Sequence, residues 1–291
     1  MRAIGVDLGG HNIAAALVED GHILNRLSEP TSGREPNIVV DQIASLMDKL
    51  GADLNLPVGV GIPGVLDRTR ENTLLLPNFT GWDGIPFRRM LEAALRRPVK
   101  LENDANCYAL GEGWGGAARG MTDYALLTLG TGIGGGIVIG GKILIGSHGM
   151  AAEPGHIVTG TTEPCGCTSH GHMEAIGGAD ALEREAKGMG LDPDLKKLWP
   201  RRMEKRVAPL WDKWIDNLAK GIATIIQLLD PQAVILGGGL SRGEGLINAL
   251  RPVTLDYLAP PYRSTLDLRT SALGGDAPVI GAASLAAISK D

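Results

Sequence analysis

The chain has 291 residues, a hydrophobic fraction of 44% and a charged fraction of 21%, which are ordinary values for a soluble globular protein. Its formal net charge of -5 and the lack of a basic run argue against a nucleic-acid-binding surface, because phosphate contacts dominate that affinity. The longest apolar runs are too short to span a membrane, and no signal peptide precedes the first strand-like segment. Three cysteines make a poor disulfide framework, so we expect a reduced, cytoplasmic protein with metal-binding or free thiols.

The first third of the chain predicts an alternating α/β arrangement. Short apolar runs predict strands over 3–8, 13–20, 22–27, 58–64 and 99–104. Apolar residues at helical spacing predict a helix over 36–50 that stops at Gly51, and a second helix over 86–97.

The second half repeats this layout. Strands are predicted over 125–130, 137–140, 142–146 and 233–236, with a long helix over 208–229 and another helix within 237–250. In both halves a strand leads through a glycine turn into two further strands, and the two copies lie about 120 residues apart. This spacing suggests a duplicated architecture.

Glycine-rich turns follow strands at three places, and two familiar motifs can be excluded there. Gly130, Gly132 and Gly135 have the spacing of a dinucleotide fingerprint, but a hairpin follows them where that fingerprint requires a helix. Gly136, Gly141 and Lys142 nearly match a P-loop, but Ile143 stands where a magnesium-binding hydroxyl is needed.

The remaining interpretation of these turns is a phosphate cradle. Turns without Cβ atoms let backbone N–H groups approach an anion, and the three turns together favour this over simple tight turns. The turns are Gly9-Gly10, Gly130–Gly136 and Gly237–Gly239. Asp7, just before the first turn, could hold Mg²⁺ through water.

A series of motifs resembles the ROK family (repressors, open reading frames, kinases), and within it the bacterial glucokinase-type sugar kinases. In chain order they are DLGG (7–10), VGIPGVLD (60–67), PNFTGWDG (77–84), ENDAN (102–106), LGTGIGGGI (129–137), EPGH (153–156), CGCTSHGHME (165–174) and VILGGGLS (234–241). Only Met1 and Arg2 precede the first strand, which favours a kinase over a regulator that carries an added helix-turn-helix domain.

The resemblance implies an actin-like, ribonuclease-H-like fold with two α/β domains around a central cleft. We expect a smaller N-terminal α/β domain over 1–107, completed by a C-terminal helix over 279–291, and a larger domain over 108–278 that contains the zinc loop. The family also suggests a homodimer.

The resemblance assigns the catalytic chemistry to the end of the strand over 99–104. Asp104 is similar to the family's general base, which accepts the proton of the attacking hydroxyl, and Asn103 would hydrogen-bond the sugar. From the residues alone, an Asn-Asp cap on a following helix is the favoured interpretation of this pair, and only the family resemblance reverses this.

Further binding residues follow from the same resemblance. The sugar would contact Gly64, Asn78, Asn103, Asp104, Glu153, His156 and Glu174. ATP and its Mg²⁺ would contact Asp7, Gly9, Gly10, His11, Gly130, Thr131, Gly132, Gly134, Gly237, Gly238 and Gly239. Position 11 departs from the family, which has threonine there followed by a basic residue, whereas this chain has His11 and Asn12.

The stretch 155–174 is similar to the family's structural zinc loop. His156, Cys165 and Cys167 match three ligands, and His172 stands in place of the third cysteine. Histidine is an equally good zinc ligand, although His170 could compete for the position.

Three functions remain open at this stage. The first is ATP-dependent phosphorylation of the primary hydroxyl of glucose. The second is the same reaction on an N-acetylhexosamine or mannose. The third is a catalytically weak sugar-binding sensor, which the departure at His11 and Asn12 motivates.

Overall fold

The computed structural model describes residues 1–51, 55–76, 79 and 81–288, and the chain forms two compact units. Unit 1 consists of Met1–Met121, Gly136–Ala152 and Ala272–Asp291, and unit 2 of Thr122–Gly135 and Glu153–Ser271. The expected domain division at residue 107 stays a prediction. In the structure, this residue lies inside a helix of unit 1.

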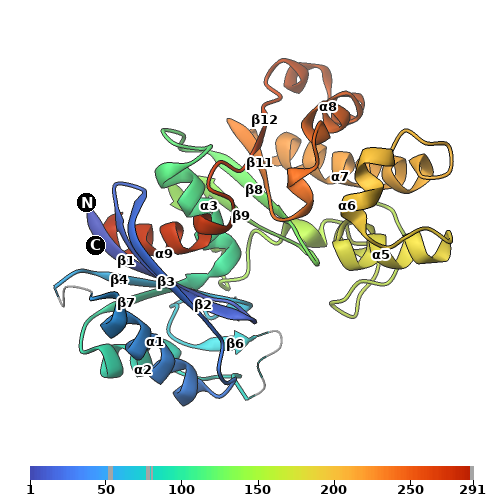
Figure 1. Ribbon diagram of the computed structural model, residues 1–291. Coiled ribbons are helices and arrows are strands. Elements are labelled where there is room, and N and C mark those ends of the chain that lie inside the picture. The colour runs from blue at the N-terminus through green and yellow to red at the C-terminus, as the bar shows by residue number, and fades with distance from the viewer. Residues whose placement is uncertain (52–54, 77–78, 80, 289–291) are drawn as a thin grey trace. The chain divides into compact units, whose positions relative to one another are not determined.

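A five-stranded sheet forms the centre of unit 1, with strand order β3-β2-β1-β4-β7 (Figure 1). Its strands are β1 (Arg2–Leu8), β2 (Asn12–Glu19), β3 (His22–Pro30), β4 (Val58–Ile62) and β7 (Val99–Asn103). β1 is antiparallel to β2 and parallel to β4, so the sheet changes direction at its centre. A small hairpin of β5 (Val65–Leu66) and β6 (Thr73–Leu75) follows β4.

Helices cover both faces of this sheet (Figure 1). They are α1 (Pro36–Leu50), α2 (Phe87–Leu95), α3 (Asp104–Gly115) and α9 (Ala277–Ile288). Alternate residues of β1 point to opposite faces: Ile4 and Val6 join the core with α1 and α2, whereas Ala3 packs with Val279 of α9. The helix α1 ends at Gly51 with φ 66°, as the sequence predicts.

Glycines let α9 approach its neighbours without intervening side chains. A Cβ on Gly281 would lie 1.6 Å from the carbonyl oxygen of Cys107 in α3, and one on Gly5 would lie 1.9 Å from that of Val279. No side chain fits at such distances, so the α3–α9 contact depends on glycine.

The second sheet repeats the order of the first, as β10-β9-β8-β11-β12. Its strands are β8 (Tyr124–Leu129), β9 (Ile133–Ile139), β10 (Lys142–Ile143), β11 (Ala233–Gly237) and β12 (Leu268–Thr270). In the first sheet the central strand β1 pairs in parallel with β4. In the second sheet the central strand β8 likewise pairs in parallel with β11. The predicted duplication is therefore present in the topology.

Unit 2 carries most of the remaining helices. The α-helices are α4 (Glu174–Gly177), α5 (Ala179–Gly188), α6 (Leu195–Leu198), α7 (Ala208–Leu229) and α8 (Leu246–Tyr257). The 3-10 helices along the chain are η1 (Pro154–His156), η2 (Trp199–Arg201), η3 (Leu240–Arg242), η4 (Pro260–Ser264) and η5 (Gly274–Asp276). Among the described residues, no helix is both long and apolar enough to cross a membrane.

Several predicted strands have different bounds in the structure, and β3, for example, extends to Pro30 where a strand over 22–27 is predicted. β9 begins at Ile133, inside the expected glycine loop, and β10 ends at Ile143 where a strand to residue 146 was predicted. Gly135 and Gly136 lie inside β9 and pack closely against other segments. A Cβ on Gly135 would lie 2.3 Å from the carbonyl oxygen of Leu126, and a Cβ on Gly136 would lie 2.8 Å from the Cβ of Ala109. These glycines serve close packing and not a turn.

Candidate functional site

The residues assigned to catalysis lie where β7 meets α3 in unit 1. The Oδ1 of Asn103 accepts from the backbone N–H of Ala105 and Asn106 at 2.9 and 3.1 Å, so Asn103 is the N-cap of α3. Its Nδ2 donates to the carbonyl oxygen of Gly64 at 2.7 Å. Asp104 is therefore the first residue of the helix, and its backbone direction is set by the cap.

A second carboxylate in unit 1, that of Asp7, interacts electrostatically with Asp104. Burial, and then the charge of Asp104, raise the pKa of Asp7 from its ordinary 3.8 to about 7, whereas Arg26 acts weakly in the opposite direction. A buried carboxyl near a second one is a place where a bound cation would favour the ionised form. This electrostatic environment fits the expected metal-binding role of Asp7.

The first glycine loop is held through its carbonyl groups. The hydroxyl of Thr31 donates to the carbonyl oxygen of Gly9 at 2.9 Å, and Nη2 of Arg34 donates to that of Gly10 at 3.1 Å. A Cβ on Gly10 would meet nothing within 4 Å, and His11 is exposed. The loop leaves room beside Gly10, and the guanidinium of Arg34 contacts it from outside the loop.

The second glycine loop, in unit 2, is fixed by the start of α5 and by β8. The N–H of Ala179 donates to the carbonyl oxygen of Gly130 at 2.8 Å. The N–H of Gly130 donates to the carbonyl oxygen of Gly132 at 3.0 Å, and the N–H of Gly134 donates to Oγ1 of Thr128 at 3.2 Å. Of the four residues expected to meet phosphate there, Thr131 and Gly132 remain the better candidates for N–H donation.

The third glycine turn lies against the second. Gly237 ends β11, and Gly238 has φ +84°, a conformation that favours glycine. A Cβ on Gly238 would lie 2.5 Å from the carbonyl oxygen of Leu129. The turn over 237–239 therefore packs directly on the strand end that leads into Gly130.

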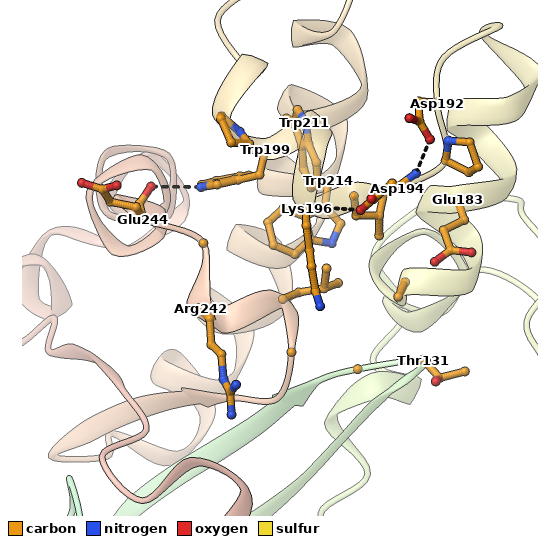
Figure 2. A pocket seen from close by; sticks show the side chains of 18 residues that line it. Thr131, Glu183, Asp192, Asp194, Lys196, Trp199, Trp211, Trp214, Arg242 and Glu244 are labelled. Atoms are coloured by element: carbon orange, nitrogen blue, oxygen red, sulfur yellow. Dashed lines mark hydrogen bonds between the residues drawn. The ribbon is translucent and has the colours of Figure 1, made fainter.

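Beside these two turns, unit 2 contains a pocket of about 860 Å³ (Figure 2). Gly130, Thr131 and Gly239 line one side of it. The opposite wall is formed by three indole rings, Trp199, Trp211 and Trp214, in edge-to-face contact with centroids 5.0 to 6.1 Å apart. Charged side chains, including Lys196, Arg242, Asp192 and Glu183, complete the lining.

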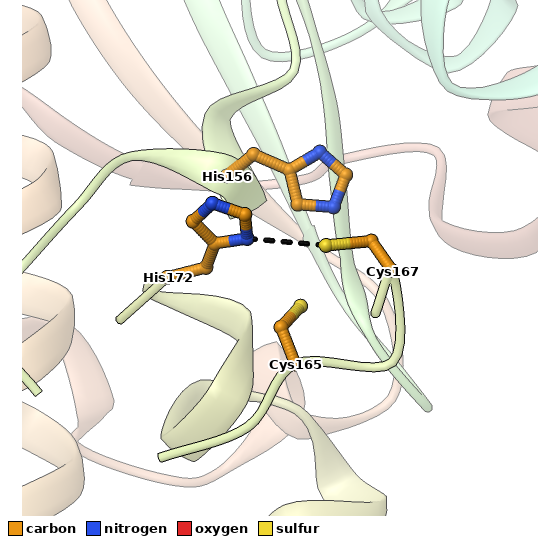
Figure 3. A group of neighbouring side chains, drawn as sticks. All are labelled: His156, Cys165, Cys167 and His172. Atoms are coloured by element: carbon orange, nitrogen blue, oxygen red, sulfur yellow. Dashed lines mark hydrogen bonds between the residues drawn. The ribbon is translucent and has the colours of Figure 1, made fainter. Parts of the chain in front are cut away.

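The four predicted zinc ligands come together in unit 2 (Figure 3). One ligand atom from each of His156, Cys165, Cys167 and His172 lies within 4.8 Å of the others, and Sγ of Cys167 is 3.3 Å from Nδ1 of His172. His170 is not a member of this group. Burial raises the pKa of the Cys165 thiol to about 11; the backbone N–H of Cys167 acts in the opposite direction, whereas the side chains of Cys167 and Glu174 raise it further. A bound cation would therefore be needed to keep this sulfur as a thiolate.

Glu174 connects this cluster with the second glycine loop. Its Oε2 accepts from the N–H of Ile133 at 2.7 Å, and its Oε1 lies 3.5 Å from Sγ of Cys165. Burial, and then the charge of Glu174, raise the pKa of Glu153. The three expected sugar ligands of unit 2, Glu153, His156 and Glu174, thus belong to one local arrangement around the cluster.

Gly64, one of the predicted sugar-site residues, follows β4. Gly64 has φ +90° and accepts the hydrogen bond from Asn103 described above. Asn78 lies outside the described residues.

The motifs gave no indication of the indole wall of the pocket. Trp211 and Trp214 lie on α7 and Trp199 on η2, more than ten positions earlier. Only the bend of the chain between η2 and α7 brings the rings together, and no local pattern marks it.

Comparisons with known proteins identify relatives along nearly the whole chain. The family model that matches is that of the ROK family, over residues 3–288. The glucokinase of Thermotoga maritima is 37% identical over 309 residues, covering 98% of this chain and 97% of that protein. The N-acetyl-D-glucosamine kinase of Citrobacter koseri is 32% identical over 282 residues, covering 89% of this chain and 91% of that protein.

Solved structures of such proteins have the same fold. The ROK hexokinase of Thermus thermophilus matches with a TM-score of 0.89 and 34% identity, covering 99% of this chain and 98% of that one. A ROK glucokinase of Streptomyces griseus, solved in complex with glucose and AMPPNP, matches with a TM-score of 0.82 and 32% identity, covering 99% and 100%. The expected actin-like fold class is confirmed.

Proposed function

Because this chain belongs to the ROK family, we propose that it is an ATP-dependent sugar kinase that phosphorylates glucose at its primary hydroxyl. The observation that carries the proposal is the similarity to glucokinases from one end of the chain to the other. The motif order, from DLGG to VILGGGLS, supports it.

In this proposal Asp104 is the general base. Phosphoryl transfer depends mainly on positioning and charge neutralisation, with one group to accept the proton of the attacking hydroxyl. Asp104 leaves β7 at the first turn of α3, where its backbone is fixed by the Asn103 cap. Asn103 and Gly64, joined by a hydrogen bond, would bind sugar hydroxyls nearby.

We assign ATP to the glycine turns and to the pocket of unit 2. Thr131 and Gly132 would donate to phosphate oxygens, and Gly9, Gly10 and His11 would meet phosphate from unit 1. The wall formed by Trp199, Trp211 and Trp214 suits the flat, apolar face of a nucleobase. Mg²⁺, held by Asp7 through water, would neutralise charge on the phosphates.

The Cys₂His₂ cluster fits a structural zinc ion, since two sulfurs and two imidazoles are a common closed tetrahedral set. We propose that His156 binds zinc through one ring nitrogen and a sugar hydroxyl through the other, with Glu153 and Glu174 as further sugar ligands. Zinc analysis of the purified chain should give one ion, retained by His170→Ala and lost by His172→Ala. Equal zinc content in the two variants would contradict this ligand set.

The experiment that tests the function is a coupled assay of ADP release with a panel of hexoses. We expect turnover with ATP that depends on glucose and exceeds that with mannose and N-acetylglucosamine. Similarity to N-acetyl-D-glucosamine kinases makes that sugar the second candidate, and the same panel would reveal it. Measurable sugar binding without ADP release from any hexose would contradict a kinase and favour a sensor.

A cytoplasmic location and a homodimer remain proposals. The first follows from the free thiols, and the second from the family resemblance. Light scattering of the purified protein tests the oligomeric state.

A further inference from the structure

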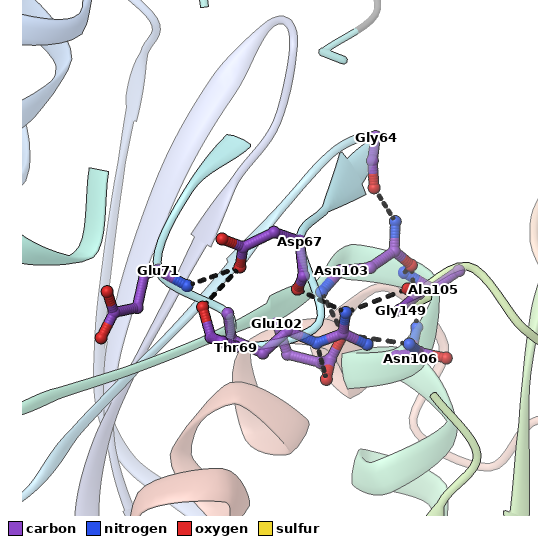
Figure 4. Close-up of polar contacts among 10 residues, drawn as sticks. Gly64, Asp67, Thr69, Glu71, Glu102, Asn103, Ala105, Asn106 and Gly149 are labelled. Carbon is purple, nitrogen blue, oxygen red and sulfur yellow. Dashed lines mark hydrogen bonds and ion pairs between the residues drawn. The ribbon is translucent and has the colours of Figure 1, made fainter. Parts of the chain in front are cut away.

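A buried ion pair joins Arg70 to Glu102, which lies two positions before Asp104. Nε of Arg70 donates to Oε2 of Glu102 at 3.0 Å, and the two side chains are only 12% and 4% exposed. Nη1 of Arg70 also donates to the carbonyl oxygens of Asp67 and Gly149, at 3.1 and 3.0 Å (Figure 4). Arg70 therefore joins the hairpin loop between β5 and β6 to β7 and to the loop over 144–152.

The other oxygen of Glu102 contacts residues on both sides of Asp104, the backbone of Asn103 and the side chain of Asn106. Oε1 accepts from the N–H of Asn103 at 2.8 Å and from Nδ2 of Asn106 at 3.0 Å. These residues come immediately before Asp104 and two positions after it. The Glu102 carboxylate, which Arg70 holds, thus contacts Asn103 and Asn106, the residues that flank Asp104 in sequence (Figure 4).

The hairpin loop is built to place Arg70 there. The carboxylate of Asp67 accepts from Thr69 Oγ1, the N–H of Glu71 and Nδ2 of Asn72, at 3.0, 3.0 and 2.6 Å. Within this turn Arg70 has φ 57°, a left-handed conformation that is unfavourable for a residue with a side chain. The surrounding hydrogen bonds hold this conformation.

Gly149 contributes to the same arrangement. It has φ +85°, and a Cβ on it would lie 2.9 Å from Arg68 N and 3.0 Å from Nη1 of Arg70. The loop can approach the hairpin only because this residue is glycine. Four residues further along the chain comes Glu153, one of the proposed sugar ligands.

We propose that Arg70 is a positioning residue for the sugar-phosphorylating site, acting through Glu102 on Asn103 and Asp104. The inference rests on the proposed function. A buried ion pair is an inefficient way to stabilise a fold, because the desolvation of both charges offsets their attraction. A role in orientation explains why a buried, hydrogen-bonded ion pair stands at this position.

The test separates orientation from stability with three variants. Arg70→Met should lower both the urea midpoint and kcat, because it leaves the Glu102 charge buried without a partner. In Arg70→Met/Glu102→Gln the charge is gone and the glutamine oxygen can still accept from Asn103. We expect this double variant to recover the midpoint but to keep a kcat about tenfold or more below that of the wild type, with KM for ATP unchanged.

Arg70→Lys keeps the charge but loses the planar fork, so we expect a near-normal midpoint with reduced kcat and several-fold weaker glucose binding by calorimetry. Arg88→Met is the matched control. Arg88 pairs with Glu71 of the same hairpin at 2.6 Å, and we expect unchanged kcat and glucose affinity.

Recovery of wild-type kcat together with the midpoint in the double variant, or unchanged kcat and glucose affinity in Arg70→Lys, would overturn the role of Arg70. The two proposals fail differently. No hexose-dependent ADP release from the wild type would contradict the proposed kinase activity, whereas glucose affinity in Arg70→Lys still tests the positioning.

Discussion

At the scale of single residues, the candidate site combines structural and chemical roles in the same side chains. Asn103 caps α3 and joins Gly64, as well as preceding the proposed base. Glu174 accepts a hydrogen bond from the backbone N–H of Ile133 and also lies next to Sγ of Cys165. Such residues would be hard to replace, since one substitution removes both a scaffold contact and a ligand.

Asp7 gives a prediction about pH and stability. Its pKa is raised to about 7 in the folded chain, so between about pH 4 and 7 the folded state holds a proton that the unfolded state has released. The free energy of unfolding contributed by this group must therefore fall as pH rises through that window. Asp7→Asn removes this effect, because the amide does not ionise.

Thermal unfolding without nucleotide or magnesium measures this pH-dependent contribution of Asp7 to stability. We expect Asp7→Asn to melt above the wild type at about pH 8 and to differ less at about pH 4.5, while losing turnover. Asp41→Asn, on the exposed face of α1, should behave like the wild type. A constant difference in Tm between Asp7→Asn and the wild type at both pH values would contradict the assignment.

At the scale of elements, the packing of α9 on α3, β1 and β4 depends on backbone contact. The ideal Cβ positions of Gly5, Gly59 and Gly281 all lie within 2 Å of a carbonyl oxygen across the contact, at 1.9, 1.8 and 1.6 Å. A helix from the C-terminal end of the chain thus completes unit 1 by fitting against glycines far away in sequence.

Gly281→Ala should therefore destabilise the protein by about 2 kcal/mol or more, because overpacking exceeds the gain of about 1 kcal/mol in helix propensity. Gly275→Ala is the control, since its Cβ would meet nothing within 4 Å. Urea unfolding compares the two, and equal midpoints would show that the contact can relax without cost.

Local patterns predicted most of these elements but not the contacts between distant ones. Apart from β12, which was not predicted, the strands of both five-stranded sheets and the helix ending at Gly51 follow from apolar runs and turn residues. The start of β9 does not, because Gly135 and Gly136 look like a turn until Leu126 and Ala109 are placed against them.

The same limit applies to the candidate site. The proposed zinc ligands could be named because the stretch from His156 to His172 resembles the family's zinc loop, and the structure brings them together. The role of Arg70 could not, since its partner Glu102 lies 32 positions away and an arginine in a hairpin loop resembles any solvated charge. Family resemblance, and not spacing, singled out Asp104.

At the scale of the whole molecule, one sheet pattern occurs twice, and we propose that the two halves supply different parts of the chemistry. The first copy carries Asp7, Asn103 and Asp104, and the second carries the loop over 130–134 and the metal cluster. Relatives that match along the whole chain share this organisation, which identifies the family independently of any single motif.

The central claim is that Asp104 accepts the proton of a glucose hydroxyl during transfer from ATP. Its most direct measurement is kcat for glucose-dependent ADP release by Asp104→Asn, with glucose affinity and the urea midpoint measured on the same preparation. We predict a loss of about a hundredfold or more in kcat, with the midpoint unchanged. Near-normal turnover by a folded, glucose-binding Asp104→Asn variant would contradict the account.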